Sequence, residues 1–233
     1  MGKQLGSKNV LLPGRQLNFR PTLELEKAAA DRGFKQIAGV DEAGRGPLAG
    51  PVVVAAVILG EAWKTEHQLN DSKKLSEKKR EQLFEIICTE AAAYKIVAIS
   101  AEDIDRLNIL QATLLGMLRC LTEIVPTPDY ALVDGNIFPK TEIQGEAVVK
   151  GDGRSKSIAA ASILAKVTRD QLMLENAKHY PEWGFEQHKG YPTIQHRRAI
   201  EKYGLSPLHR KSFRLKSLVT QENRNSTSQL SLL

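Results

Sequence analysis

Two adjacent acids, Asp41 and Glu42, stand at the end of a short apolar run and precede a glycine-rich turn. A second apolar, β-branched run begins at Val52. Short apolar runs bounded by Gly and Pro are typical of strands, so we expect both acids where a buried strand ends. An ionised carboxylate is costly to bury alone, and carboxylate oxygens are the ligands that Mg²⁺ prefers. The pattern therefore predicts either a divalent-metal site or an acid that pairs with Arg45 in the turn.

Two further acids follow strand-like runs later in the chain. Asp134 comes directly after Tyr130–Val133, and Asp152 follows Glu146–Val149. Each could simply belong to a turn, because both have glycine neighbours. Ligand sites in open α/β sheets gather at the carboxyl ends of strands, so the recurrence predicts that both acids converge with Asp41–Glu42. Acids without His or Cys suit Mg²⁺ or Mn²⁺ rather than zinc, and two such ions about 4 Å apart serve phosphodiester cleavage.

The two adjacent acids cannot occupy the site in the same way. Successive side chains of a strand point to opposite faces of the sheet. We expect Asp41 to lie squarely on the site face and Glu42 to reach the site from where the strand starts to turn.

The positions of these acids depend on alternating strands and helices. Strands are expected at residues 37–42, 52–59, 94–100, 130–133 and 146–149, and helices at 22–32, 77–92, 103–121, 157–178 and 193–203. Residues 180–191 are expected to form a loop. This order favours an α/β fold with a mixed sheet, antiparallel among the first three strands and parallel at the last two.

Composition narrows the possible partners. The chain has 233 residues and a formal net charge of +6, which suits one domain with a polyanionic partner such as nucleic acid. Cys88 and Cys120 lie in apolar patterns and are interpreted as buried small side chains, and no Cys/His set has zinc spacing. A strand-like run follows residues 44–50, which excludes a dinucleotide-binding turn. With no membrane-spanning stretch or signal-peptide core, we expect a soluble, cytoplasmic protein.

The chain resembles the bacterial ribonuclease HII family through motifs that cover about residues 35–213. The matching segments are GVDEAGRGPLAGP at 39–51, DSKKL at 71–75, VDGN at 133–136, VKGD at 149–152, IAAASILAKVTRD at 158–170 and GYPT at 190–193. Their order and length make the resemblance specific. The related ribonuclease HIII family carries a further N-terminal domain, for which the residues before Ile37 are too few.

The resemblance implies a fold and a division of the chain. It implies a ribonuclease H-like fold, with a mixed five-stranded sheet flanked by helices and a helical C-terminal extension. The catalytic domain is expected over residues 35–213, after a partly loose extension at 1–34 and before a polar, disordered tail at 214–233. A monomer is expected.

The resemblance also implies an activity. The family cleaves the RNA strand of RNA–DNA hybrids and nicks duplex DNA 5′ of single embedded ribonucleotides, leaving 5′-phosphate and 3′-hydroxyl ends. The implied catalytic and metal-binding residues, for two Mg²⁺ or Mn²⁺ ions, are Asp41, Glu42, Asp134 and Asp152. The implied substrate contacts are Gly44, Arg45, Gly46, Lys73, Lys74, Ser162, Lys166 and Tyr191. Basic residues that are further candidates for phosphate contacts are Lys150, Arg154, Lys156 and Arg169.

Two other functions remain open from the sequence. One is a nucleic-acid-binding module of the same fold without catalysis, which would not explain carboxylates that repel phosphate when no metal is bound. The other is a metal-dependent nuclease of DNA junctions, against which Gly44–Gly46 and Tyr191 argue. The histidines receive no catalytic role, although His209–Lys211 is a candidate nucleic-acid contact.

Overall fold

The structure is a computed structural model that describes residues 20–60, 63, 67, 69 and 72–213. The predicted tail at 214–233, most of the predicted N-terminal extension and Asp71 of the DSKKL motif lie outside these residues. No helix among the described residues has both the length and the apolar character needed to cross a membrane.

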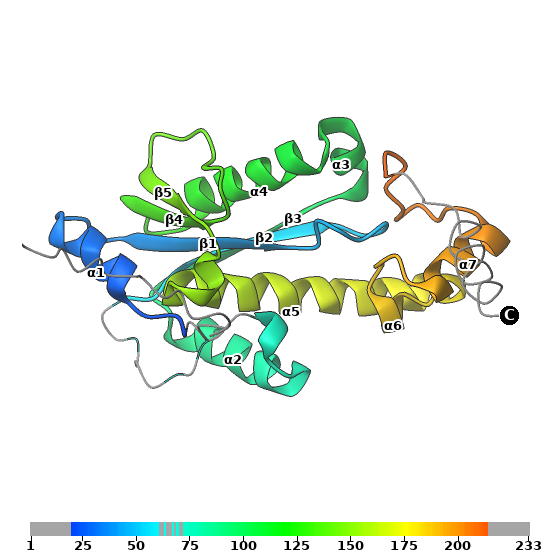
Figure 1. Cartoon of the computed structure of the whole chain (residues 1–233), viewed down its shortest axis with the longest axis horizontal. Coiled ribbons are helices and arrows are strands. Elements are labelled where there is room, and N and C mark those ends of the chain that lie inside the picture. The colour runs from blue at the N-terminus through cyan, green and yellow to red at the C-terminus, as the bar shows by residue number, and fades with distance from the viewer. Residues whose placement is uncertain (1–19, 61–62, 64–66, 68, 70–71, 214–233) are drawn as a thin grey trace, which may run out of the picture.

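A mixed five-stranded sheet forms the centre of the molecule (Figure 1). Its strands are β1 (Ile37–Ala43), β2 (Val52–Ile58), β3 (Ala93–Ile99), β4 (Tyr130–Asp134) and β5 (Gln144–Val148). They lie in the order β3-β2-β1-β4-β5, with β1 to β3 antiparallel and β4 and β5 parallel to β1. The predicted fold class is confirmed, including its division into antiparallel and parallel parts.

Helices cover both faces of the sheet. In Figure 1, α3 (Ala101–Leu107) and α4 (Ile109–Glu123) lie on one side, and α5 (Lys156–His179) and α2 (Glu77–Glu90) lie on the other. The backbone of α5 comes very close to β1 at Gly39, where an added Cβ would lie 2.1 Å from the carbonyl carbon of Ser157. Because Gly39 faces α5, the alternation of side chains also turns Asp41 toward α5.

One predicted helix is two helices. The segment expected to be helical from 103 to 121 forms α3 (Ala101–Leu107) and α4 (Ile109–Glu123), separated by Asn108 at φ 68°. Asn tolerates this left-handed φ better than most residues, and its Oδ1 accepts hydrogen bonds from the N–H groups of Leu110 and Gln111. Apolar periodicity continues across the break, which is why periodicity alone predicted a single helix.

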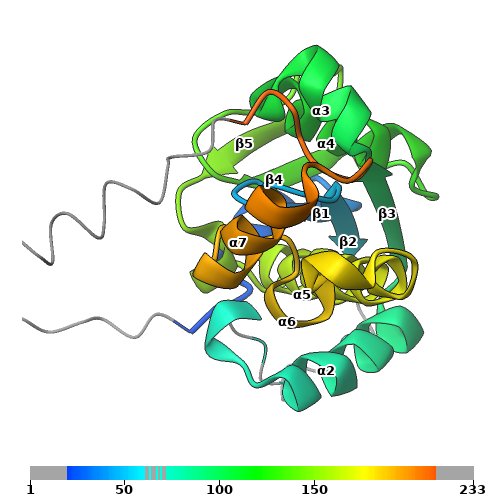
Figure 2. The ribbon, with the colours of Figure 1, turned by 90° about the vertical axis from the view of Figure 1, so that its right-hand side faces the viewer.

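The C-terminal part folds back on the turn that follows β1. Residues 180–191, expected to be a loop, contain the short helices η3 (Pro181–Trp183) and α6 (Phe185–His188), and α7 (Ile194–Tyr203) follows with Thr193 as its predicted N-cap. Figure 1 places α6 and α7 at one end of the molecule, and they face the viewer in Figure 2. The backbone of Gly50 donates to Leu208, so residues far apart in sequence together form this end.

Candidate active site

Asp41 lies near the C-terminal end of β1, and Asp134 is the last residue of the neighbouring parallel strand β4. Val40 of β1 is in register with Val133 of β4, so the acids occupy the next pair of positions. Residues in register on parallel strands point to the same face, and here that face is covered by α5. Asp41 is buried at 5% exposure, and the negative charges of Asp41 and Asp134 act on each other.

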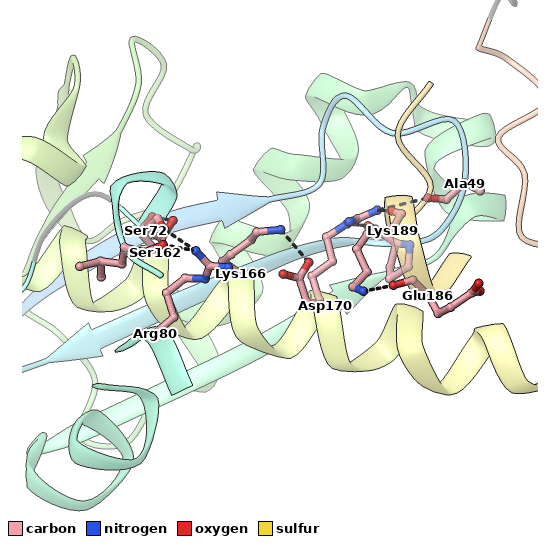
Figure 3. A network of polar contacts seen from close by, with 11 residues as sticks. Ala49, Ser72, Arg80, Ser162, Lys166, Asp170, Glu186 and Lys189 are labelled. Carbon is pink, nitrogen blue, oxygen red and sulfur yellow. Dashed lines mark hydrogen bonds and ion pairs between the residues drawn. The ribbon is translucent and has the colours of Figure 1, made fainter. Parts of the chain in front are cut away.

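A chain of hydroxyl groups reaches Asp41 from α5. The Ser162 side chain hydrogen-bonds the Asp41 carboxylate and lowers its pKa against the larger effect of burial. The Oγ of Ser162 also lies 3.0 Å from Ser72 Oγ (Figure 3). Either hydroxyl of the Ser72–Ser162 pair can be the donor. Arg80 of α2 holds the Ser72 turn in place by donating to the Ser72 and Leu75 carbonyls at 3.0 and 2.6 Å. Sequence reasoning assigned Ser162 to the substrate and missed Ser72, although it lies in the DSKKL motif.

The protein only partly neutralises the negative charge of Asp41, Glu42 and Asp134. Burial raises the pKa of Asp41 well above its usual range, and repulsion from Glu42 and Asp134 raises it further. Burial also raises the pKa of Glu42, against the opposing effect of Arg45, whose Nη1 lies 3.2 Å from Glu42 Oε1. The other oxygen, Oε2 of Glu42, is buried and accepts no hydrogen bond from any residue that the structure describes. An oxygen-only donor set with excess negative charge and an unpartnered buried oxygen fits a hard divalent cation.

The fourth predicted acid lies in the turn after β5. Asp152 belongs to η2 (Gly151–Gly153), and the preceding Gly151 donates its N–H to Asp134 Oδ1 at 2.6 Å. The turn is thereby tied to the same edge of the sheet as Asp134. Among the residues that the structure describes, no group of three or more His, Cys, Asp or Glu side chains is arranged so that it could hold a metal ion. Asp41, Glu42 and Asp134 interact, and the catalytic and metal-binding roles of all four acids stay predictions.

An exposed surface begins directly beyond these acids. Arg45 and Gly46 are exposed, and an added Cβ on Gly46 would lie 3.9 Å from Cε1 of Tyr191, itself 40% exposed. Gly46 and Tyr191 therefore form one surface, as their joint assignment to the substrate requires. Gly44 was predicted to contact the substrate with Arg45 and Gly46. Unlike them it is buried, and its Cα faces the Arg169 side chain. Lys73 is exposed, and its charge acts on Glu42.

Several predicted nucleic-acid contacts are wrong or altered. Arg169 is fully buried and donates to backbone carbonyls, so it is not available to a phosphate. His209 and Arg210 are buried as well. Lys166 is only partly exposed and forms an ion pair with Asp170 at 2.7 Å, also drawn in Figure 3. Positive charge in the sequence does not distinguish a solvated arginine from one that supports the core.

Solved structures share this fold. The chain superposes on the ribonuclease H2 of Pyrococcus horikoshii OT3 with a TM-score of 0.65 and 26% identity, covering 85% of this chain and 100% of the other. It has the same fold as Bst-RNase HIII, solved in complex with Mn²⁺, with a TM-score of 0.60 at 17% identity over 77% of this chain and 67% of the other. The sheet, with acids at the ends of adjacent parallel strands, places the chain in the class of ribonuclease H-like nucleases.

Sequence relatives identify the family within that class. The family model for ribonuclease HII matches residues 38–216. The ribonuclease HII of Clostridioides difficile strain 630 is 53% identical over 188 residues, 81% of this chain and 73% of the relative. That of Dechloromonas aromatica strain RCB is 57% identical over 177 residues, 76% and 90% of the two chains. The chain belongs to the ribonuclease HII family and is a ribonuclease H endonuclease, which confirms the resemblance seen in its motifs.

Proposed function

We propose that this ribonuclease H cuts the RNA strand of RNA–DNA hybrids and also nicks duplex DNA on the 5′ side of single ribonucleotides, with two divalent ions bound by Asp41, Glu42, Asp134 and Asp152. The observation that carries the proposal is the group of interacting, incompletely balanced carboxylates at the ends of β1 and β4. The protein balances this charge only in part, so cations are needed before a phosphodiester can approach. The occurrence of Mn²⁺ in Bst-RNase HIII supports a divalent ion.

The chain's own residues would prepare the site for hydrolysis. Bound ions would supply Lewis-acid stabilisation of the charge that develops on the phosphate. Ser162 holds the Asp41 carboxylate toward α5, and the Gly151 N–H holds that of Asp134. Both carboxylates are thus oriented before substrate arrives, which reduces the reorganisation needed in the transition state. Attack by water on phosphorus with loss of the 3′ oxygen would leave 5′-phosphate and 3′-hydroxyl ends.

Recognition of the ribonucleotide would use the surface of Gly46 and Tyr191. Only the 2′-hydroxyl distinguishes RNA from DNA at a given position, so the protein must approach the sugar closely. Gly46 has no side chain to prevent this approach, and Tyr191 offers an exposed ring and hydroxyl beside it. The ion pair between Arg45 and Glu42 connects this surface to the acids within three residues of sequence. Lys73 lies close enough to influence Glu42 and is a candidate contact for the phosphate.

The decisive experiment compares three duplexes: all DNA, DNA with one ribonucleotide, and an RNA–DNA hybrid. With Mg²⁺ or Mn²⁺ we expect a nick 5′ of the ribonucleotide and cutting of the hybrid, neither in EDTA, and no cutting of all-DNA duplex. Asp41→Asn should lower cleavage at least about 100-fold while binding is retained, because it removes one charged ligand. Cutting of the all-DNA duplex would identify a general nuclease instead, and binding without any metal-dependent cutting would identify a non-catalytic module.

Gly46→Ala is the matched variant for recognition in the same assay. Its new Cβ meets only ordinary contact distance at Tyr191, so the variant should fold normally. We expect nicking at the single ribonucleotide to fall by about tenfold or more, because a methyl group stands between the backbone and the sugar. Unchanged nicking would remove Gly46 from the proposed contact surface.

A further inference from the structure

Two buried arginines lie beneath the turn Gly44–Pro51, which we term the recognition loop. Arg169 belongs to α5 and Arg210 follows α7, and their exposures are 0% and 2%. Burying a guanidinium is costly unless its donors are satisfied. Among the described residues, the ion pairs that form include neither arginine. Both instead donate to backbone carbonyl groups, although Nη1 of Arg169 has no hydrogen-bond partner among the described residues.

Arg210 binds the recognition loop through all three of its side-chain nitrogens. Its Nη2 donates to the Gly44 carbonyl at 2.6 Å, and its Nη1 donates to the carbonyls of Arg45 and Pro47 at 3.1 and 2.9 Å. Its Nε donates to the Gly50 carbonyl at 2.9 Å. A planar fork with five N–H donors can make this set of contacts, and a lysine ammonium cannot.

Arg169 supports the other end of the same loop. It donates to the carbonyls of Pro51 and Ala49 at 3.0 and 3.2 Å. The absence of a side chain at Gly44 lets it approach, since a Cβ there would lie 2.0 Å from Arg169 Nε. Its Cζ is also 5.7 Å from the centre of the Tyr191 ring. One side chain therefore contacts both the recognition loop and the aromatic residue beside it.

These contacts decide which way the loop's amides point. The peptide bonds of the loop are trans, so each N–H points opposite to the carbonyl of the preceding residue. The carbonyls of Gly44 and Arg45 point inward to Arg210, so the N–H groups of Arg45 and Gly46 point away from it, on the exposed side. Two buried positive charges behind these donors make the surface favourable for an anion.

We propose that Arg210, assisted by Arg169, is a positioning residue that holds the recognition loop with the Arg45 and Gly46 amides directed at the sugar–phosphate backbone of the substrate, and so controls substrate affinity rather than the rate of hydrolysis. This inference rests on the proposed function of the loop. It gives Arg210, which is buried, a measurable effect on substrate binding. Arg210 is buried and donates its side-chain hydrogen bonds to the loop, so its effect on binding passes through the loop.

The experiment measures KM and kcat for Arg210→Lys on the duplex with one ribonucleotide. Lysine keeps the charge and loses most of the contacts to the loop, so we expect KM to rise about tenfold while kcat stays within about threefold. The rise in melting temperature on adding Mn²⁺ should match wild type, because the acids are untouched. Arg210→Ala should behave similarly, and millimolar guanidinium should restore part of its affinity. Arg119→Lys, on the exposed face of α4, is the control and should change neither parameter.

Each outcome decides the proposal. A folded Arg210→Lys protein with wild-type KM overturns it, as does an equal loss of kcat and of the Mn²⁺ response, which would indicate general structural damage. If Arg210→Lys does not fold, Phe213→Leu replaces it, since the Phe213 ring lies 5.0 Å from Arg210 Cζ. That variant should raise KM about two- to threefold, and no change would overturn the proposal. If wild-type protein does not nick at single ribonucleotides, the proposed specificity fails, and the same comparison on the RNA–DNA hybrid decides the role of Arg210.

Discussion

At the scale of single residues, Asp41 illustrates how a functional group can oppose folding. It is nearly fully buried, accepts hydrogen bonds from Ser162 and the Glu42 N–H, and still has a raised pKa. Desolvation and two neighbouring carboxylates outweigh the two hydrogen bonds. A residue chosen only for stability would not be charged at this position.

Asp41→Asn should therefore stabilise the metal-free protein. The folded state holds the Asp41 proton more tightly than the unfolded state, so the charged residue lowers stability as pH rises above its usual pKa of 3.8. In EDTA at neutral pH we expect a gain of about 1–3 kcal/mol, or roughly 2–8 °C in melting temperature. Mn²⁺ should raise the melting temperature of wild type and do so much less in the variant.

The control for this prediction is Asp103→Asn on α3. Arg106 and Ser100 hold the pKa of Asp103 below its usual value, so its charge is stabilising and the variant should not gain stability. Its response to Mn²⁺ should equal that of wild type. A melting temperature for Asp41→Asn at or below wild type in EDTA would contradict the interpretation of Asp41 as a strained ligand.

At the scale of elements, the break between α3 and α4 gives the two helices different directions. It lets α4 pack against the sheet without continuing the axis of α3. Asn108 makes the break, because it adopts φ 68° and caps α4 through its side chain. The buried side chains of α4, such as Met117 and Leu121, then pack against the sheet. A continuous helix would direct α3 differently, and α3 supplies Asp105, which accepts hydrogen bonds from the Lys211 and Ser212 backbone.

Replacing Asn108 should separate its two contributions. Asn108→Ala loses the cap and places an alanine at positive φ, so we expect a loss of about 2–3 kcal/mol in the free energy of unfolding. Asn108→Gly tolerates the φ and loses only the cap, so it should be less destabilised than the alanine variant. Urea unfolding at neutral pH measures both, and an alanine variant as stable as the glycine variant would contradict the role given to backbone conformation.

At the scale of the whole molecule, the C-terminal part acts as a support for the site built on the sheet. His209 Nδ1 accepts the Ser206 N–H at 2.8 Å, so its Nε2 carries the proton and donates to His196 Nε2 at 3.0 Å. His196 Nδ1 must then donate to the Tyr191 carbonyl at 2.9 Å. Two neutral histidines with determined tautomers thus connect the C-terminal segment to the residue beside Gly46.

The hydrogen bonds that join His209, His196 and the Tyr191 carbonyl predict that the protein loses stability in mild acid. Burial lowers the pKa of both His196 and His209 to about 4. The unfolded chain takes up these protons first as pH falls through about 6.5, so their contribution is complete above 6.5 and lost between 6.5 and about 4. Histidine NMR should show both imidazoles neutral down to about pH 5 in the folded protein and titrating near 6.5 in urea. Titration of either imidazole near pH 6.5 in the folded protein would contradict these hydrogen bonds.

The chemistry of the site was determined by the sequence. Acids that directly follow β-branched apolar runs must lie at strand ends, since strands of that composition are buried and the acids terminate them. This reasoning predicted the mixed sheet and the position of Asp41 on the face that α5 covers. Glu42, expected to reach the site from where the strand turns, instead lies within β1, in register with Val54 of β2. The motif order identified the ribonuclease HII family for the same reason, because family motifs gather where side chains are chemically constrained.

The supporting contacts were decided only by the tertiary structure. Nothing in the local sequence distinguishes Arg169 or Arg210 from a phosphate-binding arginine, because both roles require the same planar donor. Burial beneath the recognition loop makes the difference, and it brings together residues more than 100 positions apart, such as Arg210 and Gly44. The tautomers of His196 and His209 are also unreadable from sequence, since each depends on the partner that folding supplies. Sequence periodicity reports which side chains are buried, and packing alone determines what they touch.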